Sequence, residues 1–85
     1  MTDAIIHIIK KMLRTLDMIG PAGLEENTVK EQADIAAGFP ITTTEKDLAF
    51  QALVERGWVK SYRQELTGRI RFYLSDSGRA ALAGL

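Results

Sequence analysis

The apolar residues at the start of the chain recur with the spacing of an amphipathic helix. Between Asp3 and Ile19 they follow one another at intervals of three and four residues, and most charged residues fall opposite them. Gly20 and Pro21 end this pattern, because neither residue favours continuation of a helix. The apolar side covers an arc of about 160°, whereas one packing contact needs a stripe of only ~100°. We therefore expect this helix to have a second partner besides its own domain, either the C-terminal helix or another copy of the chain.

A second copy would pack against apolar residues of this helix. A two-fold dimer of this kind would double the contacts that the protein makes with an extended ligand. The residues expected at the dimer interface are Ile5, Ile6, Ile9 and Leu13.

Two shorter helices are expected next, each preceded by the spacing of a capping box. Thr28 with Glu31, and Thr42 with Glu45, both have the Thr-x-x-Glu arrangement. In this arrangement the two side chains satisfy free backbone N–H groups of the first helical turn. The sequence therefore predicts helix starts near residues 28 and 42.

The boundaries of these two helices follow from glycine and proline. The first is expected to end at Ala37, before Gly38, and residues 24–27 belong either to its start or to the preceding loop. Pro40 prevents helical continuation, and the second helix is expected to run up to Gly57. Two helices joined by so short a turn form a helix-turn-helix unit.

Beyond Gly57 the pattern changes from helical spacing to alternation. Residues 69–74 alternate between charged or polar and apolar side chains, as in a strand with one buried face. Residues 58–63 are the expected partner strand, joined through residues 64–68 as a β-hairpin. Ser75 is a suitable N-cap for a last helix over residues 76–83. The residues expected on the buried face of the second strand are Ile70, Phe72 and Leu74.

This order of elements predicts a mainly α fold with a small β-hairpin, an α+β class, in which three helices form the core. Residues 53–59 read LVERGWV and residues 72–82 read FYLSDSGRAAL. These segments resemble bacterial winged helix-turn-helix regulators of the MarR and PadR type, in which LxxxGxV precedes the wing and LTxxGxxAL follows it. The resemblance covers about the second half of the chain. It implies a winged helix-turn-helix fold, DNA binding and a role in transcription regulation.

Length and composition narrow the class of protein further. Eighty-five residues suffice for one domain, expected to span residues 1–85, and the absence of cysteine excludes disulfides and thiolate metal sites. The start of the chain has the features of neither a signal peptide nor a spanning helix, so we expect a cytoplasmic protein without a membrane partner. Catalytic spacing is lacking, since His7 is the single histidine and is expected to be solvated. We expect neither an enzyme nor a cofactor or metal site.

Charge is distributed unevenly along a chain whose net charge is zero. Residues 21–55 hold two lysines against seven carboxylates, a net charge of −5, and residues 56–85 hold six cations against two carboxylates, a net charge of +4. The expected wing is therefore basic and the helix-turn-helix acidic. A nucleic-acid partner would have to be attracted by a local patch and not by the whole molecule.

The basic wing leads to a prediction of duplex DNA binding. Cations on a protruding hairpin can contact phosphates, and residues near the start of a recognition helix can read bases in the major groove. Glu45 and Asp47 oppose this prediction because they would face phosphates, although both carboxylates favour the helix N-terminus where they lie. The expected DNA-contacting residues are Thr43, Thr44, Lys46 and Gln51 on the helix, and Lys60, Arg63, Arg69 and Arg71 on the wing.

The alternative is a winged-helix module that binds another protein. Its contact surface would be the acidic helix-turn-helix face or the broad apolar side of the first helix. Leu66, at the expected tip of the hairpin, could also touch such a partner, although single exposed leucines are common.

Overall fold

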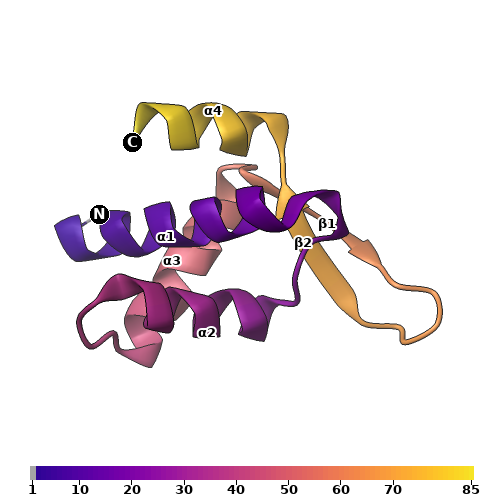
Figure 1. Cartoon of the computed structure of the whole chain (residues 1–85), viewed down its shortest axis with the longest axis horizontal. Coiled ribbons are helices and arrows are strands. Elements are labelled where there is room, and N and C mark those ends of the chain that lie inside the picture. Colours follow the sequence, from indigo (N-terminus) through magenta and orange to yellow (C-terminus); the bar gives the residue numbers. More distant parts are fainter. Residues whose placement is uncertain (1) are drawn as a thin grey trace.

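The computed structural model describes residues 2–85 as helices followed by an antiparallel ribbon and a closing helix (Figure 1). The mainly helical α+β class expected from the sequence is confirmed. In chain order the elements are α1 (Asp3–Ile19), a short 3₁₀ turn η1 (Gly20–Ala22), α2 (Glu26–Ala37), α3 (Thr43–Glu55), β1 (Val59–Arg63), β2 (Ile70–Leu74) and α4 (Asp76–Gly84).

Helix α1 is the centre of the hydrophobic core. It packs against α2 and α3, and α4 lies across it on the side away from α2 (Figure 1). Ala81 and Leu82 of α4 reach the core cluster. The wide apolar arc of α1 is thus covered within one chain, and the C-terminal helix is the second partner that the sequence predicts.

This packing corrects the expected dimer interface. Ile5, Ile9 and Leu13 are buried in the core of the single chain, so they have no surface left for a second copy. Of the four residues expected at that interface, Ile6 alone is exposed. The sequence shows that these residues are apolar, but it does not show that the other helices of the same chain bury them.

The two capping boxes have different outcomes. Thr42 caps α3 as expected: its Oγ1 accepts from the Glu45 backbone N–H at 3.1 Å, and Glu45 Oε1 accepts from the Thr42 N–H at 3.0 Å. The box expected at Thr28 is wrong, because α2 already begins at Glu26. Leu24 explains the early start, since it is held extended beside β2 and the chain turns into the helix directly after it.

Leu24 pairs with β2 on the edge that faces away from β1, and so adds a single residue of a third strand to the ribbon. Its backbone N–H donates to the Phe72 carbonyl at 2.9 Å, and the Phe72 N–H donates to the Leu24 carbonyl at 2.7 Å. Gly23 makes this approach possible: its φ is +69°, and a Cβ there would lie 2.3 Å from the Phe72 carbonyl oxygen. The pairing fixes the base of the ribbon to the start of α2.

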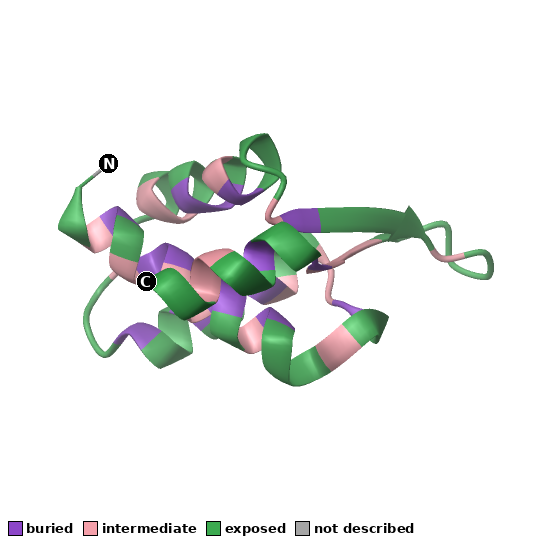
Figure 2. Ribbon diagram, turned by 90° about the horizontal axis from the view of Figure 1, so that it is seen from above, coloured by how far each residue is buried: buried purple, intermediate pink, exposed green. Residues whose placement is uncertain are grey.

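The ribbon (residues 59–74, with β1, β2 and their connection) projects beyond the helices (Figure 2). Leu74 is buried and Phe72 is partly buried, as expected, but Ile70 is 45% exposed. The expectation of a buried Ile70 is wrong because no helix extends under the outer half of the ribbon. At its tip Leu66 is 98% exposed.

The closing helix is tied to the end of α3 through one buried hydroxyl. Ser75 Oγ accepts from the Gly78 backbone N–H at 3.0 Å, which is the N-cap that the sequence predicts, and donates to the Gly57 carbonyl at 2.6 Å. Gly78 lies so close to the Trp58 carbonyl that a side chain there would overlap it. These contacts hold the start of α4 against the connection between α3 and β1.

Candidate binding surface

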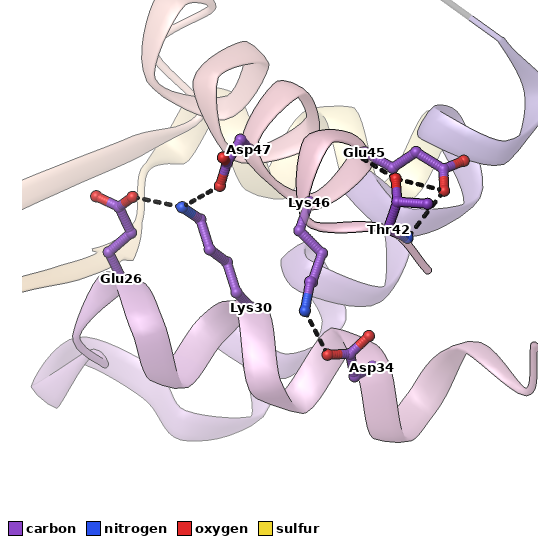
Figure 3. A network of polar contacts seen from close by, with 7 residues as sticks. All are labelled: Glu26, Lys30, Asp34, Thr42, Glu45, Lys46 and Asp47. Carbon is purple, nitrogen blue, oxygen red and sulfur yellow. Dashed lines mark hydrogen bonds and ion pairs between the residues drawn. The ribbon is translucent and has the colours of Figure 1, made fainter. Parts of the chain in front are cut away.

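Ion pairs connect the two helices of the helix-turn-helix unit (Figure 3). Lys30 Nζ on α2 lies 2.7 Å from both Glu26 and Asp47, and thereby joins α2 to α3. Lys46 on α3 reaches back to Asp34 on α2 at 2.5 Å. Both cations between residues 21 and 55 are therefore held by carboxylates of the same unit.

The charge of Lys30 is stabilised where it lies. Desolvation alone would lower the pKa of this ammonium group, but hydrogen bonds to Asp47 and Glu26 outweigh that effect and raise its pKa above 10.5. Lys30 therefore stays charged at neutral pH and fixes the position of both carboxylates.

The four residues expected to read bases form no basic surface on α3. Thr43 and Thr44 are exposed at the helix start, but Lys46 turns toward α2, and its side chain is only 18% exposed. Gln51 is exposed, and its Nε2 donates to Glu55 Oε1 at 2.8 Å. The solvent side of α3 consequently presents carboxylates where a DNA reader would carry cations.

The register of the ribbon separates the cations expected to form one patch. Lys60 pairs with Tyr73 and Tyr62 pairs with Arg71, so these side chains share one face, whereas Arg63 pairs with Ile70 on the other face. The sequence contains this signal, because residues 60 and 63 differ by an odd number of positions along a strand.

Arg71 and Arg69 are held by neighbouring groups. Arg71 donates from Nε to the Gln64 side chain and from Nη1 to the Gly23 carbonyl, both at 3.2 Å. Arg69 Nη1 lies 3.4 Å from Glu25 Oε1. The single basic patch expected on the wing is therefore not formed, and Arg71 serves to anchor the ribbon to the loop before α2.

A cleft of about 500 Å³ opens between α2, α3 and the ribbon. Its floor is apolar: the Phe50 and Phe72 rings meet edge to face with centroids 4.9 Å apart, and Val54 beside them is 49% exposed. Its rim carries the Glu26 and Asp47 carboxylates. The residues that line the cleft are Glu26, Lys30, Asp47, Phe50, Gln51, Val54 and Phe72.

A second hollow, of about 380 Å³, lies between the end of α1 and α2. Met18 is 86% exposed beside it and Ile35 is 76% exposed. The sequence analysis did not single out Ile35, although it is the one isoleucine in a helix whose packing side is built from valine and alanine. This hollow is flanked by no comparable set of charges among its lining residues.

The remaining candidates for chemistry lie apart from these surfaces. His7, expected to be solvated, packs against Phe39 with ring centroids 5.3 Å apart, and its Nε2 is buried without a hydrogen-bond partner. Within residues 2–85, His, Asp and Glu side chains form no group of three suited to a metal ion. None of the helices formed by these residues is long and apolar enough to cross a membrane.

Comparison with protein-family models, with curated proteins and with solved structures gives no match to this chain. The resemblance to MarR and PadR regulators therefore remains a prediction from the residues of the second half of the chain.

Proposed function

We propose that this chain is a winged helix-turn-helix domain that recognises a basic, partly apolar segment of another protein. The order of the elements supports the fold assignment. The bridge between Leu24 and β2, which adds a third strand position to the ribbon beside the helix-turn-helix, supports it as well. The binding site is the cleft between α2, α3 and the ribbon.

The observation that carries this proposal is the charge of the cleft. Asp47 and Glu26 stand on its rim, and Lys30 and Lys46 are already held by ion pairs within the unit. Duplex DNA presents a dense row of phosphates, and specific binding depends on cations that neutralise them. The charged residues that line the cleft are Glu26, Asp47 and Lys30, and their net charge of −1 disfavours phosphates and favours lysine and arginine side chains.

The cleft also has the layout of a protein-binding site. Phe50 in the floor is buried and Phe72 is partly exposed, so Val54 provides most of the apolar area that would lose water on binding, and charges at the rim steer the partner and select its sign. Because Lys30 fixes Asp47 and Glu26 before the partner arrives, these carboxylates lose little freedom on binding.

The proposal is tested by fluorescence anisotropy with a labelled amphipathic peptide that has lysine on one face and leucine on the other. Binding is expected to weaken about tenfold or more in Asp47→Lys, which reverses the charge of the rim. Glu31→Lys, exposed on α2 but not part of the cleft lining, is the matched control and should bind like the wild type. The same peptide with glutamate in place of lysine should not bind. Equal binding by wild type and Asp47→Lys would overturn the proposal.

A second candidate function, DNA binding through the ribbon alone, is favoured by a specific observation. Lys60 and Arg63 are exposed, and among the described residues no carboxylate lies within ion-pair distance of either. If Arg69 exchanged its exposed contact with Glu25 for a phosphate, the ribbon would make three phosphate contacts, and raising the salt from 50 to 200 mM would then weaken binding about fortyfold. Titration of labelled random duplex DNA tests this candidate: salt-dependent binding that Lys60→Glu/Arg63→Glu abolishes would establish it. Absence of binding at 50 mM salt would exclude it.

A further inference from the structure

We propose that the segment bound in the cleft is the ribbon of a second copy of this chain, so that the protein forms a two-fold dimer. This inference rests on the proposed function and names its partner. It follows from the cleft and the ribbon being complementary to each other in charge and in apolar character.

The ribbon has the chemistry that the cleft selects. Arg63 and Ile70 pair across the two strands on the same face as Phe72, which itself lines the cleft. The Arg63 guanidinium donates to the Gly68 carbonyl at 3.3 Å, and in the described part of the chain no carboxylate pairs with it. Ile70 is half exposed beside it, and Leu66 stands fully exposed at the tip. One face of the ribbon thus offers a cation without a carboxylate partner in the described residues, with exposed Ile70 beside it, and the tip adds exposed Leu66.

The cleft offers the opposite charge and a matching apolar floor. Asp47 retains a carboxylate oxygen beyond the one that accepts from Lys30, and Val54 is exposed two helical turns further along the same side of α3. Placing Arg63 of one copy against Asp47 of the other would bring Ile70 or Leu66 over Val54. Each copy would then bury apolar groups that are exposed in the single chain.

The division of charge along the chain makes two copies attract each other in this orientation. Residues 21–55 carry a net charge of −5, the ribbon holds four cations against Glu65 for a net charge of +3, and the whole chain has a net charge of zero. Two copies therefore meet without overall repulsion, and the basic ribbon of each faces the acidic helix-turn-helix of the other.

Two-fold symmetry lets the same contact form twice between two copies, so that the assembly is closed at the dimer. In an isologous interface, Arg63 of each copy meets Asp47 of the other, so that the ion pair is formed at two places. Asp47 lines the cleft, and Arg63 lies on the face of the ribbon that carries Phe72, which also lines the cleft. Closure at two copies, unlike a head-to-tail chain, leaves no free cleft on which a filament could grow.

Sedimentation equilibrium of the full chain at about 10 to 300 µM tests the dimer, since this range covers weak protein association. The wild type is expected to dimerise at 50 mM salt, and the dissociation constant should rise at least about tenfold at 500 mM salt, where exposed charges are screened. Arg63→Glu should raise it at least about tenfold at low salt. The matched control is Lys60→Glu, which changes the same charge on the opposite face of β1 and should leave the dissociation constant unchanged.

A charge exchange makes the test independent of folding defects. Arg63→Glu and Asp47→Lys should each be monomeric alone, and their equimolar mixture should form a heterodimer in which the reversed pair is restored at one of the two places. Wild-type chain that stays monomeric at about 300 µM and 50 mM salt, or a mixture that fails to associate, would overturn the dimer. In that case the cleft proposal would still be judged separately, by whether the lysine and leucine peptide loses affinity for Asp47→Lys.

Discussion

Replacement of Gly23 by alanine should release the ribbon from the start of α2. Gly23 has a φ of +69°, which costs an L-residue about 1 kcal/mol, and the new Cβ would lie 2.3 Å from the Phe72 carbonyl oxygen. Backbone atoms must move apart to relieve that overlap. The movement breaks the two Leu24–Phe72 hydrogen bonds, worth about 1 kcal/mol each. We expect Gly23→Ala to lower the free energy of unfolding by about 3 kcal/mol in total.

Gly38→Ala isolates the conformational part of this cost. Gly38 ends α2 with a φ of +76°, and a Cβ there would meet no atom within 4 Å, so we expect a loss of about 1 kcal/mol. Urea unfolding followed by circular dichroism measures both variants against the wild type. If Gly23→Ala is no less stable than Gly38→Ala, then the Leu24–Phe72 pairing does not fix the ribbon.

The consequence for binding can be measured in the same variant. The Gly23 carbonyl accepts from Arg71, so movement at this position also frees the side chain that anchors the ribbon. The ribbon forms one wall of the cleft through Phe72. We expect the amphipathic peptide to bind Gly23→Ala more weakly than Gly38→Ala under conditions where both variants are folded.

Three further results are expected. Ser75→Ala should cost about 1 to 3 kcal/mol in urea unfolding, because it leaves the buried Gly78 N–H without its cap; an unchanged midpoint would contradict this. Leu13→Ala should cost about 2 to 5 kcal/mol, whereas the exposed Ile6→Ala should stay within about 1 kcal/mol, and equal losses would argue against the core assignment. Lys30→Met should be less stable than the wild type up to pH 10.5. Because the folded pKa of Lys30 is raised, that difference should shrink only as the pH rises through the folded value, and a difference that stays constant to higher pH would refute the ion-pair contribution.

The sequence predicts most elements because their signals are local. The apolar period of α1, the capping box at Thr42 and the cap at Ser75 each depend on residues within a few positions of one another. The start of α2 depends instead on Leu24 pairing with Phe72, which lies 48 positions away. That tertiary contact, and not the capping-box spacing at Thr28, determines where α2 begins.

The candidate site was harder to predict for a related reason. Strand alternation already separates Arg63 from Lys60, but the hydrogen bonds of Arg71 to Gly23 and the pairing of Lys46 with Asp34 require the folded chain. Charge counted along the sequence identifies the acidic unit correctly. It does not reveal which cations are engaged within the chain, and that difference moves the expected binding surface from the ribbon to the cleft.

The most direct test of the cleft as the recognition surface is an amide NMR titration of the ¹⁵N-labelled chain with the lysine and leucine peptide and, separately, with duplex DNA. The peptide is expected to shift the amides of Asp47, Gln51 and Val54 on α3, while DNA leaves the spectrum unchanged at 150 mM salt, where the Debye length is about 8 Å. Shifts produced by DNA along the ribbon, with the amides of α3 unmoved by the peptide, would contradict this account.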